Sequence, residues 1–166
     1  MPAVLQLTRR LIQKPQVVPV ERITVRTWGG HEDIPRWLEL RRQAFARQQF
    51  GVRGWNRDDF EREFLGKPWW QPGRMWLAET DHQHRLVGSV TLAHRGDPDV
   101  GKPVVHWLLV SPAYRGQGIG RLLMATLEAA CWDEGVRQIW LETHTGWKEA
   151  SRFYAALGYM PVDSSD

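Results

Sequence analysis

The chain has 166 residues, of which 42% are hydrophobic, so it is long and apolar enough for one domain with a sizeable core. Its formal net charge of +3 favours anionic ligands, but the lack of a long basic run or a nucleic-acid-binding motif argues against nucleic acid as a partner. The sequence shows no apolar run of about 18 residues and no leader followed by a cleavage site, so we expect a cytoplasmic protein with no membrane partner.

The N-terminal residues differ in character from the rest of the chain. Residues 1–22 mix basic and apolar residues with three prolines, and we interpret them as an N-terminal extension. Residues 23–166 alternate periodic apolar segments with turn signals, which predicts a single domain. In chain order we expect a strand over 23–28, helices over 34–47 and 57–65, strands over 75–79, 86–94 and 104–110, a helix over 119–134, a strand over 138–142 and a helix over 147–157.

Local signals support this order of elements. Asp33 and Asn56 stand where they can cap the first two helices, and Gly135 can end the third. Residues 104–110 are apolar on both faces, so their strand should lie in the centre of the sheet. Cys131, the single cysteine, lies on the apolar stripe of the third helix, which favours packing over nucleophilic catalysis. The expected fold class is α/β, with a central mixed β-sheet flanked by helices.

A glycine-rich turn joins the central strand to the third helix. Gly116, Gly118 and Gly120 have no Cβ atom, so the backbone can curl with successive N–H groups facing one point. The positive end of the helix dipole lies at the same place. Arg115 before the turn and Arg121 in the first helical turn can add charge-assisted hydrogen bonds. Together these features predict an anion site that fits a pyrophosphate.

The spacing of the glycines separates three kinds of phosphate-binding loop. A P-loop is excluded because no lysine follows the glycines. A dinucleotide-binding fingerprint is closer, since Glu142 lies roughly 20 residues after the turn, where a ribose-binding acid is expected. However, the pattern is G-x-G-x-G, and the 46 residues after Gly120 are too few for repeated βαβ units. A dinucleotide-binding oxidoreductase fragment therefore stays open as the third and weakest of our three interpretations.

Two motifs resemble signatures of the GNAT superfamily of acyl-CoA-dependent N-acetyltransferases. Residues 115–120, Arg-Gly-Gln-Gly-Ile-Gly, are similar to the family's Arg/Gln-x-x-Gly-x-Gly/Ala loop, and residues 110–114 are similar to the segment that precedes it. Residues 150–159, Ala-Ser-Arg-Phe-Tyr-Ala-Ala-Leu-Gly-Tyr, resemble the second signature. The resemblance covers about residues 22–162, and the expected order of elements is also the order of that family.

The resemblance also indicates how the C-terminal end of the sheet differs here. The family usually continues with further strand after the second signature, whereas seven residues follow Tyr159. We therefore expect the last strand to be short or missing. Residues 16–20 of the N-terminal extension could cover that edge of the sheet, in the same chain or in a neighbour.

The resemblance implies acetyl-CoA as cosubstrate and no metal. Backbone groups of the central strand would contact the acetyl and pantetheine parts, and the glycine turn would hold the pyrophosphate. Trp147 replaces an asparagine often found seven residues before the family's tyrosine, and could lie against the pantetheine or cover the cleft. The implied cofactor-binding residues are Leu108, Leu109, Val110, Arg115, Gly116, Gln117, Gly118, Ile119, Gly120, Arg121, Trp147 and Ser151.

Acyl transfer to an amine also needs a proton donor for the leaving thiolate and a means of deprotonating the amine. Tyr154 occupies the position of the tyrosine that often protonates the thiolate in this family. His106 is a candidate base, since an unperturbed histidine pKa of about 6.5 suits that role, and Glu142 and His144 are its rivals. For Tyr154, His106 and Glu142 a purely structural role stays open, and a base is not required if the amine arrives neutral.

Ten tryptophans exceed what a core of this size needs. Those that precede the second strand, together with a histidine after the last long strand, could bind the acceptor, although packing is an equally open role. These candidates are Trp28, Trp55, Trp69, Trp70 and His144. Residues 54–69 are similar to a stretch of mycothiol-synthase-like members of the family, which does not identify the acceptor.

Our interpretation is an N-acetyltransferase that transfers an acetyl group from acetyl-CoA to a primary amine by direct attack in a ternary complex. The acceptor is a small molecule or a protein amino group, and the small molecule is favoured because the chain shows no added recognition domain. The alternative is an acyl-CoA-binding or sensing module without turnover. The family resemblance is consistent with a homodimer.

Overall fold

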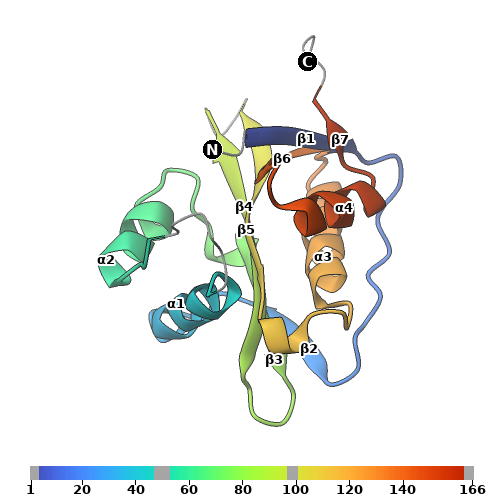
Figure 1. The fold of residues 1–166 in the computed structure, drawn as a ribbon. Coiled ribbons are helices and arrows are strands. Elements are labelled where there is room, and N and C mark those ends of the chain that lie inside the picture. The colour runs from blue at the N-terminus through green and yellow to red at the C-terminus, as the bar shows by residue number, and fades with distance from the viewer. Residues whose placement is uncertain (1–3, 47–52, 97–100, 163–166) are drawn as a thin grey trace.

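The computed structural model describes residues 4–46, 53–96 and 101–162 and contains a mixed β-sheet with helices on both faces (Figure 1). Its strands are β1 (Val4–Arg10), β2 (Ile23–Thr27), β3 (Met75–Thr80), β4 (Leu86–Arg95), β5 (Lys102–Val110), β6 (Gln138–His144) and β7 (Met160–Pro161). Its helices are α1 (Asp33–Ala44), α2 (Arg57–Phe60), α3 (Ile119–Asp133) and α4 (Lys148–Ala156), with a π turn over Glu61–Leu65 and 3₁₀ turns over Pro72–Arg74 and Pro112–Tyr114.

The strand order in the sheet is β2-β3-β4-β5-β6-β1-β7. Neighbouring strands are antiparallel except β5 and β6, which are parallel. Helices α1 and α2 cover one face of the sheet, and α3 and α4 cover the other (Figure 1). The predicted α/β architecture is therefore confirmed, and each strand and helix expected between residues 23 and 157 is present within a few residues of its expected bounds. The last residue of the first expected helix, residue 47, lies outside the described residues.

Strand β1 corrects our interpretation of the N-terminal residues as an extension. Of the expected extension, residues 1–22, the segment Val4–Arg10 lies inside the sheet between β6 and β7. It pairs with β6 along its whole length. Its apolar residues alternate with polar ones, as a strand with one buried face requires, and Leu7 is 3% exposed. The basic residues and prolines around this short alternation obscured it in the sequence.

The C-terminal edge of the sheet agrees with the expectation in one respect and differs in another. Strand β7 has two residues, so the prediction of a short last strand is confirmed. The N-terminal segment at this end of the sheet is β1, which pairs with β6 on one side and with the edge strand β7 on the other, whereas we expected residues 16–20 to cover the edge. Residues 16–20 form no strand and run as irregular chain, with Val17 and Val18 exposed.

A buried ion pair anchors β1 to the α3 face of the sheet. Glu128 of α3 is 2% exposed, and its Oε2 atom accepts hydrogen bonds from Arg9 Nη1 at 2.8 Å and from the Tyr159 hydroxyl at 2.9 Å. Burial raises the pKa of the Glu128 carboxyl, while the Arg9 charge and these hydrogen bonds oppose that rise. The N-terminal strand thus supplies the cation that a buried carboxylate needs.

The core has two parts, one on each face of the sheet. On the α3 side, the aliphatic part includes Val90, Leu123, Leu127 and Ile139. On the α1 side, the second part is largely aromatic and includes Trp37, Phe60 and Phe64. Helix α3 packs closely because β4 carries glycine at position 88, where a Cβ atom would lie 2.9 Å from side-chain atoms of both Ile119 and Leu123. Cys131 is fully buried and its pKa is raised to about 12 by burial, in agreement with a packing role.

Candidate active site

A β-bulge in β5 turns two consecutive side chains to the same face of the sheet. The register with β4 shifts between Ser89 and Thr91, so that a single β4 residue opposes two residues of β5. Trp107 adopts a left-handed backbone conformation with φ of 52°. The His106 ring lies 5.7 Å from Phe64, and the Trp107 ring lies 4.9 Å from Trp55, so both point to the α1 side.

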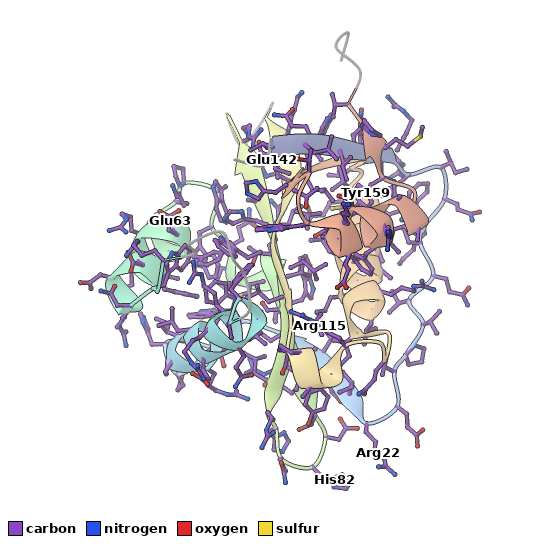
Figure 2. The ribbon with its side chains drawn as sticks, in the orientation of Figure 1. Arg22, Glu63, His82, Arg115, Glu142 and Tyr159 are labelled. Carbon is purple, nitrogen blue, oxygen red and sulfur yellow. The ribbon has the colours of Figure 1, made fainter. Side chains whose placement is uncertain are left out.

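The strands β5 and β6 separate beyond the bulge and leave a cleft between them. Their parallel pairing is confined to Val104 with Trp140 and Val105 with Leu141. The cleft has a volume of about 1170 Å³ and is lined by β5, the glycine turn, the start of α3, the end of β6 and α4. Figure 2 shows the labelled Glu142 at the β1 and β6 end of the sheet and Arg115 closer to the middle.

The glycine turn forms one wall of the cleft. Gly116 and Gly118 have φ of 80° and 90°, a region that L-residues with side chains rarely adopt. Gly118 is the N-cap of α3 and offers no side-chain cap, so the first N–H groups of the helix are left for a ligand. A Cβ atom on Gly120 would lie 3.3 Å from Phe153 of α4. The wall is therefore a cradle of backbone donors that suits a diphosphate, as the acetyl-CoA expectation requires.

The two arginines that flank the glycines differ in what they contact. Arg115 donates from Nη2 to the carbonyl oxygen of Ala44 at 3.1 Å and from Nε to that of Val110 at 3.3 Å, so its guanidinium ties the turn to the end of α1. Arg121 is exposed on the first turn of α3, lines the cleft and has no ion-pair partner among the residues that the structure describes. Arg121 is the better placed of the two to meet a phosphate.

Most of the residues expected to bind the cosubstrate lie along this cleft. Those that line it are Leu108, Leu109, Val110, Arg115, Gly116, Gly118, Ile119, Gly120, Arg121 and Trp147. Gln117 is exposed in the turn and Ser151 lies within α4, and neither of these two side chains is part of the lining. The resemblance to a family motif therefore predicted where the turn lies, but it could not predict which side chains point into the cleft.

Tyr154 of α4 lines the cleft on the α3 side of the sheet. Its hydroxyl group has no hydrogen-bond partner among the described residues, and its ring packs 5.3 Å from Phe153 and 6.0 Å from Tyr159. Burial raises the pKa of Tyr154 well above its ordinary value. The phenol therefore stays protonated at neutral pH and can donate a proton.

His106, Glu142 and His144 all line the cleft, but their surroundings differ. Burial, with the charges of Lys67 and Arg95, lowers the pKa of His106 to about 4, so its imidazole is neutral at physiological pH. Glu142 is exposed and forms an ion pair with Arg95. The Nδ1 atom of His144 is buried without a hydrogen-bond partner among the described residues.

The four tryptophans expected at the acceptor pocket pack in the aromatic core, and none of them lines the cleft. Trp28 stacks on Phe60 at 5.5 Å and Trp55 on Trp37 at 5.7 Å. The other two, Trp69 and Trp70, lie 6.4 Å and 6.0 Å from Phe64. This arrangement favours the packing interpretation of all four.

Other aromatic side chains form the α1 side of the cleft. The sequence indicated Trp147 and His144 as candidates for the site, but it did not indicate Phe45 or Trp107. Phe45, at the end of α1, lies 5.8 Å from Trp107 and 6.1 Å from Trp147, and Trp147 lies 4.5 Å from His144. These rings come from three separate segments, namely the end of α1, the β5 bulge and the end of β6 with the turn that follows it, and all of them line the cleft. For Trp107 the only sequence signal was its position next to His106, since a bulge cannot be read from the apolar pattern.

A buried cation supports this aromatic wall from behind. Arg41 of α1 is 5% exposed, and its Cζ atom lies 4.4 Å from the ring of Trp55, 5.0 Å from Trp107 and 5.7 Å from Phe45. Its Nη1 atom donates to the carbonyl oxygen of Arg53 at 2.9 Å. Burial and the nearby Arg53 charge lower the pKa of Arg41. The guanidinium is held mainly by cation–π contacts, which also restrain the Trp107 ring.

Two further observations concern metal clusters and membrane-spanning helices. No cluster of three or more His, Cys, Asp and Glu side chains able to hold a metal occurs in the described part of the chain. Among the described residues no helix combines the length and apolar character that crossing a membrane requires.

Comparisons with known proteins agree with the expected family and fold. A sequence model of the Acetyltransferase (GNAT) family matches residues 34–159. The chain is 35% identical over 129 residues to mycothiol acetyltransferase from Mycobacterium ulcerans, covering 71% of this chain and 39% of that protein. It is 30% identical over 158 residues to mycothiol acetyltransferase from Thermomonospora curvata, covering 93% and 50%.

A solved structure extends the comparison to the fold. The GCN5-related N-acetyltransferase from Sphaerobacter thermophilus superposes with a TM-score of 0.78 at 21% identity, covering 98% of this chain and 50% of that one. The chain thus spans about half the length of these relatives at most. The matches support the acetyltransferase interpretation over a dinucleotide-binding one.

Proposed function

Because the chain belongs to the GNAT family of acetyltransferases, we propose that it transfers the acetyl group of acetyl-CoA to the primary amine of a small molecule by direct attack in a ternary complex. The observation that carries this proposal is that one continuous cleft is lined by the glycine turn, by Tyr154 and by the β5 bulge. We call the α3 side of this cleft the donor side and the α1 side the acceptor side.

The donor side fits the cosubstrate. Acetyl-CoA, when bound, supplies a thioester that is activated for attack by an amine. The backbone N–H groups at the start of α3 and the guanidinium of Arg121 would hold the diphosphate. The apolar side chains of Leu108, Val110 and Phe153 would exclude water from the arm that leads to the thioester.

Two proton transfers accompany the reaction, one on each side of the cleft. As the amine nitrogen bonds to the carbonyl carbon, the carbon–sulfur bond breaks and the Tyr154 hydroxyl donates its proton to the sulfur. The amine loses a proton to water or to a neighbouring group, and the Tyr154 phenolate afterwards takes up a proton from water, so that the phenol is restored for the next turnover. His106, with a pKa of about 4, is a weak base, so the acceptor would bind largely as the neutral amine. The positive charges of Arg95 and Lys67 near His106 favour that neutral form.

The names of the matched relatives suggest a first acceptor. Both curated relatives are called mycothiol acetyltransferases, which makes the amine precursor of mycothiol the first compound to assay. The aromatic wall of Phe45, Trp107 and Trp147 suits a compact acceptor better than a protein chain. Glu142, engaged by Arg95, and His144 lie where they can contact that acceptor.

A binding and turnover experiment tests the proposal. The melting temperature of the purified protein should rise with acetyl-CoA and with CoA but not with NAD, because a ligand that binds only the native state stabilises it. Release of free CoA thiol from acetyl-CoA should then depend on added amine, with the mycothiol precursor compared against simple amines and a peptide. No shift with any CoA species would reject the proposal, and a shift without amine-dependent turnover would reject the acyl-transfer part.

A further inference from the structure

One hydroxyl group in the cleft is buried without a hydrogen-bond partner. Thr143 near the end of β6 is 4% exposed, and its Oγ1 atom has no partner among the described residues. The same residue lines the cleft. Burying an unpartnered hydroxyl destabilises a protein, so such groups in native structures are few and call for an explanation. A ligand that supplies the missing partner is the explanation that the position of Thr143 favours.

The register of the sheet shows which side of the cleft this hydroxyl faces. Thr143 stands directly opposite Leu5 of β1, and directly opposite residues of antiparallel strands point to the same face. Leu5 packs against the core of the α3 side, and Leu141, two residues before Thr143 on β6, belongs to that core. Thr143 therefore points to the donor side, where Tyr154 also lines the cleft.

The donor side offers few other polar side chains to a ligand between its two ends. The glycine turn provides backbone donors at one end and Tyr154 provides a phenol at the other, while the wall between them includes the apolar Leu108, Val110 and Phe153. The pantetheine arm of CoA spans the same interval between diphosphate and thiol and carries amide groups. These amides would themselves be left unpartnered against an apolar wall.

We infer that the Thr143 hydroxyl donates a hydrogen bond to an amide carbonyl of the pantetheine arm, which makes Thr143 a binding residue for the cosubstrate. The inference rests on the proposed use of acetyl-CoA. It explains why a polar residue occupies a buried position that valine could fill with the same shape. Compared with valine at this position, the hydroxyl lowers the stability of the free protein and strengthens the binding of CoA.

Two opposite effects of one substitution follow. Thr143→Val removes the hydroxyl and keeps the shape, so the free protein should melt about 2 °C higher. The same change should weaken the binding of CoA and of acetyl-CoA equally, by about fivefold. The affinity for the fragment of CoA that consists of adenosine and its phosphates, and that lacks the pantetheine arm, should not change.

Matched variants separate the hydroxyl from the packing. Thr143→Ser keeps a hydroxyl and should retain most of the affinity for CoA. Thr91→Val is the control, because Thr91 of β4 is also fully buried with an unpartnered Oγ1 atom but does not line the cleft. Its partner in the register is His106, so it faces the α1 side. Thr91→Val should raise the melting temperature without changing the affinity for CoA.

The measurements are thermal unfolding without ligand and isothermal titration with CoA, acetyl-CoA and the fragment. Unchanged CoA affinity in Thr143→Val would overturn the inference, and so would an equal loss in Thr143→Ser. A loss restricted to acetyl-CoA would also overturn it, by placing the contact on the acetyl group. If the unmodified protein bound no CoA species, the proposed function would fail together with the inference, whereas the preceding outcomes leave the proposed function intact.

Discussion

The donor side and the acceptor side of the cleft are built from different kinds of structure. On the donor side, one continuous segment, residues 115–121, presents backbone N–H groups through glycines with positive φ. On the acceptor side, the wall consists of side chains from separate segments, with Phe45 from the end of α1 and Trp107 from a bulge in β5. A short motif dictates a backbone path, whereas a wall of rings depends on how distant elements pack. The cosubstrate is therefore easier to recognise from such a chain than the acceptor.

The largest expected effect tests the chemistry assigned to the donor side. Tyr154→Phe removes the phenolic proton and keeps the ring, so kcat should fall by at least about 100-fold while KM for acetyl-CoA changes little. Steady-state kinetics with the acceptor at saturation would measure both. Tyr114→Phe, on the 3₁₀ turn before the glycines, is the matched control and should keep nearly full turnover. Turnover in Tyr154→Phe equal to that of the control would remove the tyrosine from the mechanism.

The donor side also depends on the N-terminal strand that holds α3 in place. Arg9→Met leaves the Glu128 carboxylate buried with the Tyr159 hydroxyl but without its cation, so the free energy of unfolding should fall by about 3 kcal/mol. Chemical denaturation would measure the change. Arg10→Met on the same strand removes an exposed guanidinium bonded to Gln138 and should cost less than about 0.5 kcal/mol. Equal losses in the two variants would show that the buried pair contributes nothing specific.

On the acceptor side, the lowered pKa of His106 should make the free energy of unfolding depend on pH. Its pKa is about 4 in the folded chain and 6.5 ordinarily, so between these values the unfolded chain binds a proton that the folded chain does not. The free energy of unfolding should therefore fall as the pH drops from 6.5 to 4, by up to about 3 kcal/mol from this residue. His106→Gln should lose that part of the pH dependence in denaturation series.

This test has a control variant at a second histidine and a second measurement, the pH dependence of kcat/KM. His82→Gln, on the turn between β3 and β4 at the lower end of Figure 2, should keep the pH dependence of the unmodified protein. His106 is unprotonated throughout the neutral range, so a rise of kcat/KM between pH 6 and 9 should follow the pKa of the acceptor amine and persist in His106→Gln. Loss of that rise in the variant would instead make His106 the base.

Some features of the two sides could be predicted from the sequence, and others could not. Local signals located the strands and helices between residues 23 and 157, and a motif located the glycine turn, because both depend on neighbours in the chain. Strand β1 was missed because its partner β6 lies about 130 residues away and a seven-residue alternation is a weak signal by itself. The bulge at Trp107 was missed because one residue added to a strand leaves no trace in an apolar run.

Trp147 gives a way to test where the boundary between the two sides lies. Its ring contacts Phe45 and His144, so we expect it to belong to the acceptor wall rather than to the pantetheine path. Trp147→Ala should raise KM for the amine about tenfold and leave the affinity for acetyl-CoA within about twofold. Kinetics at varied amine, combined with titration of acetyl-CoA, would measure the two effects separately. A change confined to acetyl-CoA would assign the indole to the donor side.

The smallest expected effect tests whether backbone conformation alone builds the donor side. Gly118 has φ of 90°, and an added Cβ atom would make only an ordinary contact, 3.5 Å from Val20 Cγ2. Gly118→Ala therefore introduces strain without a clash, at a cost of about 1 kcal/mol, which corresponds to about fivefold weaker binding of CoA if the turn relaxes away from the ligand. Gly73→Ala is the matched control, since Gly73 lies in open space and has no positive φ. If Gly118→Ala lowers stability but leaves CoA affinity unchanged, the diphosphate is held by Arg121 and the helix end, and the curl of the turn serves only to start α3.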